Sequence, residues 1–255
     1  MLGLVETAHA AEGISVKLAP YVLGDFYGVP ITATLVTTWL TMGLLMVLVL
    51  AGTRRLTLVP AGKLQQVFEV VVGGVYDYMA DVLESKSMAR TYFPVVTTIF
   101  LFVLSLNWVG LLPGVTAFGT YHDGHLTPWL YPAATDLNIT LAFAIVAFLT
   151  IEMAGVVALG TFRYIGKFIN FHSPLGFVIG LIELISEVAR LISFSFRLFG
   201  NIFAGKTLLV VVMFFVPYVI PVPLLAFEVF VGFIQAFIFS VLTLFFIKLA
   251  VAEPH

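Results

Sequence analysis

Ionisable side chains lie inside two long apolar stretches near the C-terminal end of the sequence. The first stretch runs from Pro174 to Pro217 and the second from Val222 to Ala250. A charged residue at the centre of a membrane helix costs roughly 2.5–3.5 kcal/mol on insertion scales, so it usually has a function there. Acids, fixed positive charges and amides at this depth are typical of an ion path. The polar residues concerned are Glu183, Glu187, Arg190, Ser193, Arg197, Asn201, Lys206, Glu228 and Gln235.

Arg197 is the charge in these stretches that most requires an explanation. Arginine does not lose its proton in proteins, so it cannot become neutral to avoid the cost of burial. It lies about twenty residues from both ends of its apolar stretch, too far for its side chain to reach the membrane surface. No acid lies within one helical turn of it on either side. We therefore expect water, backbone or a carboxylate of another subunit to compensate its charge.

Helical spacing sorts the remaining polar residues of the first stretch. Glu183, Arg190 and Arg197 follow each other at heptad spacing and so share one helix face. Asn201 lies one turn beyond Arg197 on that face. Glu187 and Arg190 are at i and i+3, where an acid and a base can pair, which is the structural interpretation of Arg190.

The two apolar stretches are expected to form an antiparallel hairpin. Pro217, Pro221 and Pro223 make the reversal from one stretch to the other, since proline cannot continue a helix interior. Lys206 and Glu228 are equally far from Pro217, so they should lie at similar depth and can neutralise each other. The same folding brings Gln235 near Arg197, where the Gln235 amide carbonyl can accept a hydrogen bond from the guanidinium.

Several of these positions also have a structural interpretation. A pair formed by Lys206 and Glu228 can serve stability alone. Glu183 and Glu187 can be solvated at the cytoplasmic interface. Gln235 can join two helices instead of lining a path.

The composition indicates that lipid is the solvent for most of the surface. The chain has 255 residues, of which 61% are hydrophobic and 10% charged, whereas soluble domains carry about 25% charged residues. A net charge of −2 shows no excess of basic residues of the kind that nucleic-acid binding requires. The absence of cysteine excludes disulfides and thiolate metal sites. No phosphate-binding loop of the GxxxxGK[ST] type is present, so we expect neither nucleotide binding nor phosphoryl chemistry in this chain.

The sequence therefore predicts an all-α membrane protein forming a single membrane domain over residues 1–255. We expect about four transmembrane spans, counting the long tilted C-terminal hairpin as two, plus one amphipathic surface helix. As one helix, the first limb of the hairpin would be about 65 Å long, twice the bilayer core, so it must be tilted, bent or broken. The predicted segments are an outer N-terminal segment (1–30), a first span (31–51), the amphipathic helix (62–85), a second span (93–112), a third span (137–160) and the hairpin (174–250).

The segment 62–85 is predicted to lie along the membrane surface. Its apolar residues recur every three to four positions, and four carboxylates occupy the other side, which argues against a crossing. A soluble helix packed on a partner is the alternative. If this segment does not cross, eight of the basic residues near the spans fall on one face, which the positive-inside rule assigns to the cytoplasm. We expect an outside N-terminus and a cytoplasmic C-terminus in a bacterial plasma membrane.

The segment Ser195–Gly205 (SFRLFGNIFAG) resembles the most recognisable motif of subunit a of F-type ATP synthases. Gln235–Thr243 (QAFIFSVLT) is similar to the second signature of that family. Two further matches support the resemblance: Leu111–Gly114 closes one span, and Thr135–Thr140 opens the next. The resemblance runs from about residue 60 to the end, with all the motifs in order.

The resemblance implies a stator subunit of the Fo membrane sector, beside a rotating ring of c subunits. Its partners would be the c ring, the peripheral stalk subunit b, the rest of the ATP synthase and the lipid bilayer, with no cofactor, metal or nucleic acid. Two offset aqueous half-channels would lead protons to and from the ring. Arg197 matches the essential arginine, which favours the ionised ring carboxylate and blocks leakage between the half-channels. The chain is not an enzyme on its own.

The resemblance also assigns roles to the other polar residues. Asn201 and Gln235 match polar positions near the arginine, Lys206 and Glu228 match the outer half-channel, and Ser193 and Glu183 match the cytoplasmic-side path. Members of the family often have an acid where Lys206 stands and a histidine where Glu228 stands. The charges are therefore exchanged here, and Glu228 becomes the expected titratable group of the outer path.

The sequence leaves three alternative functions open. The first is a sodium-translocating version of the same subunit. The second is an unrelated secondary transporter, which would need internal repeats that the sequence lacks. The third is a membrane anchor without transport, which would not need Arg197 at this depth.

Overall fold

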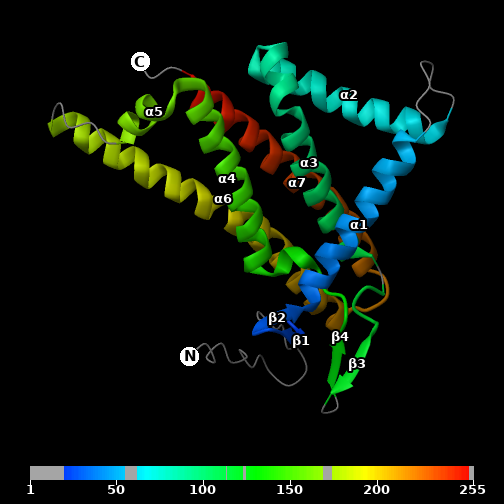
Figure 1. Ribbon diagram of the computed structural model, residues 1–255. Helices are drawn as coiled ribbons and strands as arrows, with labels where there is room; N and C mark the ends of the chain where they lie inside the picture. The colour runs from blue at the N-terminus through cyan, green and yellow to red at the C-terminus, as the bar shows by residue number, and fades with distance from the viewer. Residues whose placement is uncertain (1–19, 55–61, 113, 123–124, 169–173, 253–255) are drawn as a thin grey trace. The chain divides into compact units, whose positions relative to one another are not determined.

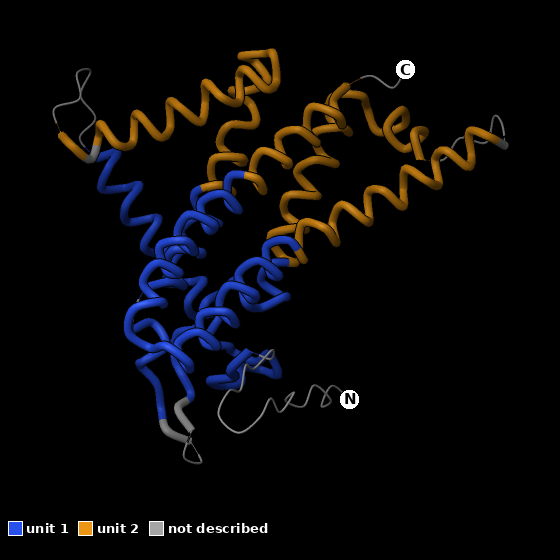
Figure 2. The backbone as a smooth tube through the Cα atoms, turned by 180° about the vertical axis from the view of Figure 1, so that it is seen from behind, with its two compact units in different colours: residues 1–54, 101–140, 197–237 blue, residues 55–100, 141–196, 238–255 orange. Residues whose placement is uncertain are grey.

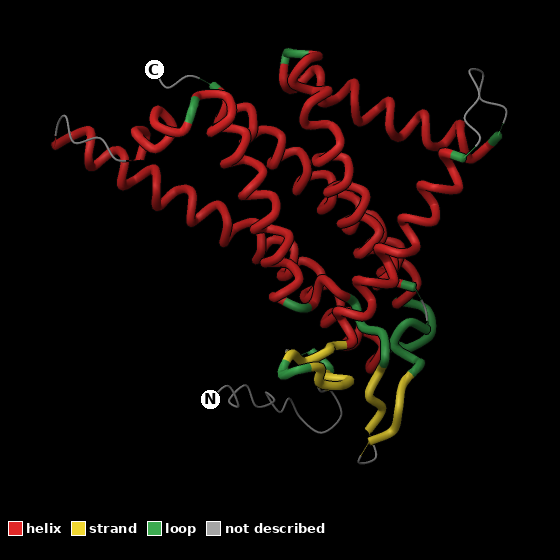
Figure 3. The backbone as a smooth tube through the Cα atoms, viewed as in Figure 1, coloured by secondary structure: helices red, strands yellow, loops and turns green. Residues whose placement is uncertain are grey.

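Helices make up most of the chain. The computed structural model describes residues 20–54, 62–112, 114–122, 125–168 and 174–252 (Figure 1). The all-α fold class is confirmed (Figure 3). Most of the predicted outer segment 1–30 lies outside the described residues. The helices found in the described residues are α1 (Ala33–Thr53), α2 (Lys63–Leu83), α3 (Lys86–Leu111), α4 (Leu137–Leu159), α5 (Thr161–Phe168), α6 (Pro174–Phe215) and α7 (Pro221–Val251).

Two small antiparallel β-hairpins accompany the helices in the described part of the chain. One precedes α1, and the other lies between α3 and α4, followed by the 3₁₀ turn η1. The register pairs Phe26 with Val29 in the first hairpin and Gly119 with Pro128 in the second. The elements are β1 (Val22–Phe26), β2 (Val29–Thr32), β3 (Gly119–His122), β4 (His125–Pro128) and η1 (Ala133–Thr135).

Five of the described helices are long and apolar enough to cross a membrane: α1, α3, α4, α6 and α7. The predicted segments, three single spans followed by the two limbs of the hairpin, match these five helices, one more than the stated count of about four. Helix α6 has 42 residues and α7 has 31, which at about 1.5 Å per residue gives lengths of about 63 Å and 47 Å. Both exceed the bilayer core of about 30 Å, as the sequence predicted for tilted limbs.

Local sequence explains where several of these helices begin and end. The hydroxyl of Thr32 caps α1 by accepting from the backbone N–H of Leu35 at 3.2 Å. Helix α6 ends at Phe215 because Pro217 disfavours the helical conformation for the residue before it. Helix α7 then starts at Pro221, where the missing N–H of proline is not needed.

Large apolar side chains cover the outside of the long helices. Met46 of α1 is 59% exposed and Val157 of α4 is 80% exposed. Soluble monomers seldom expose more than a few hundred Å² of contiguous apolar surface, so this pattern indicates contact with lipid. The exposed side chains are the expected contact surface for lipid tails. Helix α2 is not among the five apolar helices, and we retain the prediction that it lies along the membrane surface.

The chain divides into two compact units, which Figure 2 shows in different colours. Unit 1 comprises residues 1–54, 101–140 and 197–237, and unit 2 comprises residues 55–100, 141–196 and 238–255. Each unit holds one part of the hairpin formed by α6 and α7. The single membrane domain over 1–255 stays a prediction.

In unit 1, the segment before α4 is fastened to α1 by buried polar contacts. Thr34 donates its hydroxyl proton to Asp136 at 2.7 Å, and Asp136 is only 4% exposed. The hydroxyl of Thr37 accepts from the backbone N–H of Tyr131 at 3.0 Å. These bonds fix the segment that carries Tyr131, which takes part in the site described below.

In unit 2, aromatic rings join the two limbs of the hairpin. The ring of Phe194 on α6 packs against Phe239 on α7, with centroids 4.9 Å apart, and meets Phe246 edge-on at 5.8 Å. Lys248 of α7 donates to the carbonyl of Val82 at 2.9 Å and pairs with Glu84 at 2.8 Å. The end of α2 is thereby attached to α7.

Candidate ion path

A cavity of about 340 Å³ lies in unit 1 between α3, the segment before α4, and the two limbs of the hairpin. Most of its wall is apolar. Its charged lining residues are Lys206 of α6 and Glu228 of α7. The hairpin register expected from the prolines therefore agrees with the structure, because these two residues face one cavity.

The ammonium of Lys206 is held by an aromatic ring. Its Nζ lies 3.1 Å from the centre of the Tyr131 ring, within the range of a cation–π interaction. This nitrogen is buried and has no hydrogen-bond partner among the described residues. The Tyr131 ring in turn meets Tyr21 edge-on at 5.1 Å. Burial, with a smaller effect from Tyr21, raises the pKa of Tyr131 to about 12, so its phenol stays neutral at physiological pH.

Glu228 is 6% exposed, and its carboxylate lies directly against Gly205. A methyl group on Gly205 would overlap the carboxylate oxygens, so a larger residue there would require the Glu228 side chain to move. Within the described residues, no ion pair joins Lys206 to Glu228. The expected mutual neutralisation is therefore not seen, since Tyr131 takes the ammonium instead.

Helix α3 supports the limb that carries Glu228. Asn107 donates its amide N–H to the carbonyl of Gly232 at 3.0 Å, and the indole of Trp108 donates to the carbonyl of Val229 at 3.1 Å. Asn107 also packs closely against Gly232: a Cβ added to Gly232 would lie only 3.2 Å from the Cβ of Asn107. These bonds fix α7 in the turn that follows Glu228.

Arg197, Asn201 and Gln235 also belong to unit 1, but they do not line this cavity. Arg197 and Asn201 are half-buried on α6, and Gln235 of α7 is 7% exposed. The amide nitrogens of Asn201 and Gln235 are buried and lack a hydrogen-bond partner among the described residues. Unsatisfied donors at this depth are costly, which favours a functional interpretation of both amides.

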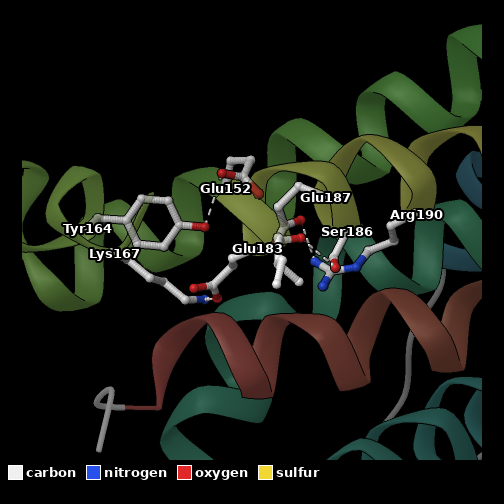
Figure 4. Close-up of polar contacts among 8 residues, drawn as sticks. Glu152, Tyr164, Lys167, Glu183, Ser186, Glu187 and Arg190 are labelled. Carbon is white, nitrogen blue, oxygen red and sulfur yellow. Dashed lines mark hydrogen bonds and ion pairs between the residues drawn. The ribbon is translucent and has the colours of Figure 1, made fainter. Parts of the chain in front are cut away.

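The remaining predicted site residues, Glu183 and Ser193, lie on α6 in unit 2. Ser193 is exposed. Glu183 is half-buried, and its carboxylate pairs with Lys167 of α5 at 2.5 Å (Figure 4). The predicted pair of Glu187 and Arg190 is confirmed, with 2.5 Å between Nη1 and Oε2.

Glu152 of α4 lies beside this cluster in unit 2. Tyr164 of α5 donates its hydroxyl proton to Oε2 of Glu152 at 3.0 Å (Figure 4). Burial and, to a lesser degree, the Glu152 carboxyl raise the pKa of Tyr164 well above its usual value. The phenol therefore remains a proton donor at physiological pH.

Sequence reasoning missed two residues that hold predicted site residues. Tyr131 carried no signal, because an aromatic residue in a connecting segment has many uses. Lys167 is one of the eight basic residues on which the predicted orientation rests, and the sequence gives no further signal for it. Its partner Glu183 could have been suspected from the short connection between the two helices.

Comparison with known proteins identifies the family. The family model described as ATP synthase A chain matches residues 35–248. ATP synthase subunit a of Geobacter sp. (strain M21) is 34% identical over 220 residues, covering 86% of this chain and 88% of the relative. Subunit a of Moorella thermoacetica is 32% identical over 219 residues, covering 86% of this chain and 90% of the relative. The chain therefore belongs to the ATP synthase A chain family, whose members are the non-catalytic, proton-translocating stator subunit a of the Fo sector.

Proposed function

We propose that Arg197 is the fixed positive charge at which this subunit exchanges protons with the carboxylates of a c-subunit ring. A guanidinium beside a ring carboxyl group favours its ionised form, so a proton arriving on the ring is released there. Because arginine stays protonated, the same charge repels protons and blocks direct leakage along the subunit. Its position in the motif Ser195–Gly205, inside the matched range 35–248, supports this role.

The outer half-channel uses the cavity in unit 1. The observation that carries this proposal is a cavity with apolar walls whose charged lining residues are Lys206 and Glu228. Water-filled cavities with ionisable side chains are typical of ion pathways through membranes. Glu228 serves as the proton-exchanging group, since Tyr131 holds the ammonium of Lys206. Asn201 and Gln235 supply the polar side chains near Arg197.

The cytoplasmic-side path uses Glu183 and Ser193 of unit 2. Glu183 is half-buried, which suits a carboxylate that passes protons between the protein and the adjacent water. One charge that crosses 100 mV gains about 2.3 kcal/mol. Several protons per turn of the ring are therefore needed to drive the synthesis of one ATP.

The topology follows from the five apolar helices. An odd number of crossings leaves the two ends of the chain on opposite faces of the membrane. The basic residues beside the spans favour a cytoplasmic C-terminus and an outside N-terminus, in a bacterial plasma membrane. The hairpin of α6 and α7 faces the c ring, and the peripheral stalk subunit b attaches the subunit to the rest of the enzyme.

The experiment replaces Arg197 by alanine in the assembled complex, reconstituted in vesicles. We expect gradient-driven ATP synthesis to be lost while the complex still assembles, and passive proton leakage to rise. Arg54→Ala is the matched control, because Arg54 is an exposed arginine just after α1 and outside the hairpin; it should leave synthesis unchanged. Normal synthesis by the Arg197→Ala complex would contradict the proposal. Synthesis driven by a sodium gradient without a proton gradient would assign sodium as the transported ion instead.

A further inference from the structure

Helix α5 is in contact with both of its neighbours along the chain within unit 2 (Figure 4). Lys167 reaches α6, where its Nζ lies 2.5 Å from Oε1 of Glu183. Tyr164 reaches α4, where its hydroxyl donates to Glu152 at 3.0 Å. Since Tyr164 and Lys167 are at i and i+3, one face of a short helix supplies both contacts.

Close packing fixes α5 on both sides. Tyr164 is 3% exposed, and its ring fills the space beside Gly155 of α4, where a Cβ would overlap it. On the other side, the carbonyl of Phe168 lies against Gly180 of α6, which likewise leaves no room for a Cβ. The ring of Phe168 meets that of Tyr164 edge-on at 5.6 Å. The position of Lys167 is therefore set by the packing of its own helix.

Each carboxylate on this part of α6 has its own cation. Arg190 pairs with Glu187, and its guanidinium also lies 3.9 Å from the centre of the Phe246 ring. Arg190 is thus already engaged on both sides. Lys167 remains as the cation of Glu183, and both side chains are partly covered, with 22% and 29% exposed.

We infer that α5 is a positioning element for proton transfer, in which Lys167 holds the Glu183 carboxylate in place and Tyr164 anchors the helix to α4. This inference rests on the proposed role of Glu183 in the cytoplasmic-side path. A proton-transfer group must lie within hydrogen-bond reach of the group from which it takes its proton. A carboxylate held at one point by a packed helix meets this requirement, whereas a freely rotating one meets it only part of the time. Because both side chains are partly exposed, water weakens their attraction, so the held carboxylate can still exchange its proton, unlike a carboxylate in a buried ion pair. Lys167 acts through the Glu183 carboxylate and Tyr164 through the packing of its ring against α4, so both are positioning residues.

The test measures gradient-driven proton flux per assembled complex in reconstituted vesicles. We expect Lys167→Gln to lower the flux several-fold, and Lys167→Arg, which keeps the charge, to restore most of it. Arg163→Gln is the matched control, because Arg163 is an exposed cation of the same helix without an ion pair in the described part of the chain. Equal flux in the Lys167→Gln and Arg163→Gln complexes would overturn the inference.

A second pair of variants separates this inference from the proposed function. Glu183→Gln should lower the flux, and adding Lys167→Gln to it should have no further effect, because the group being positioned is gone. If Glu183→Gln alone leaves the flux normal, the proposed role of Glu183 is wrong. If Glu183→Gln lowers the flux and Lys167→Gln lowers it further in that background, Lys167 acts elsewhere and the positioning role is wrong.

The anchor is tested at Tyr164. Tyr164→Phe keeps the ring beside Gly155, so the flux should stay close to that of the unmodified chain. Tyr164→Leu removes the ring and should lower the flux as Lys167→Gln does, without an added effect in the Glu183→Gln background. Unchanged flux in the Tyr164→Leu complex would contradict the anchoring role.

Discussion

The ammonium nitrogen of Lys206 lies 3.1 Å from the centre of the Tyr131 ring, and no ion pair joins this lysine to Glu228 in the described residues. Both charged residues nevertheless line the same cavity. An aromatic face attracts a cation without supplying a full negative charge. The interaction therefore keeps the ammonium in place and leaves the Glu228 carboxylate available for protons.

The first prediction concerns this ring. Tyr131→Leu removes the aromatic face, so we expect Lys206 to turn toward Glu228 and form an ion pair with it. Proton flux should then fall by up to about thirtyfold, since a desolvated cation–π contact contributes about 2 kcal/mol and each 1.4 kcal/mol is a factor of ten. Tyr131→Phe keeps the face, and flux through that complex in vesicles should match the unmodified one. Normal flux with leucine would show that the ring does not control the position of the lysine.

The Tyr131→Phe variant also tests how the flux depends on pH. The pKa of Tyr131 is raised to about 12, so its neutral form is the one stabilised by folding. That stabilisation is fully present below about pH 10, the usual phenol pKa, and is lost as the pH rises through 12. Tyr131→Phe should therefore leave the flux–pH profile unchanged between about pH 6 and pH 9. A difference within this range would mean that the Tyr131 hydroxyl itself takes part in proton transfer.

The second prediction concerns Glu228. Glu228→Gln keeps the size of the side chain but cannot exchange a proton. We expect proton flux to fall by at least about tenfold in complexes that assemble normally, because positioned acid–base groups contribute factors of this order or more. Asp77→Asn, which removes an exposed carboxylate on α2, is the control and should conduct normally. Normal conduction by the Glu228→Gln complex would contradict the assignment of Glu228 as the titratable group of the outer path.

Contacts within one helix or across one tight reversal were predictable from the sequence. The pair of Glu187 and Arg190 follows from their i, i+3 spacing, and the hairpin follows from the prolines between its limbs. The placement of Lys206 and Glu228 beside one cavity follows from their equal distance from Pro217.

Contacts between segments distant in the chain were not predictable in this way. Tyr131 reaches Lys206 from a connecting segment whose place is fixed by the hydrogen bond from its backbone N–H to Thr37. No periodicity links these three residues.

The third prediction concerns the glycine beside Glu228. Gly205→Ala places a methyl group where the carboxylate now lies, so Glu228 must move or α6 and α7 must separate. We expect lower proton flux per assembled complex even though alanine favours the helix. Gly43→Ala in α1 meets no atom within 4 Å and should leave flux unchanged. Equal flux in the two variants would mean that the exact position of the carboxylate is unimportant.

The fourth prediction concerns the bond that fastens the segment before α4 to α1. Thr34→Val removes the hydroxyl that donates to Asp136 at 2.7 Å and leaves a buried carboxylate oxygen without this donor. Such a loss costs about 1–3 kcal/mol, so the thermal unfolding midpoint of the chain in the purified complex should fall. Thr38→Val is the matched control, because that hydroxyl donates only to the carbonyl of Thr34 in its own helix. Flux through the Lys206 cavity should fall with the Thr34 variant alone, since the same segment carries Tyr131. A midpoint that falls equally in both variants would assign the effect to the helix and not to the bond with Asp136.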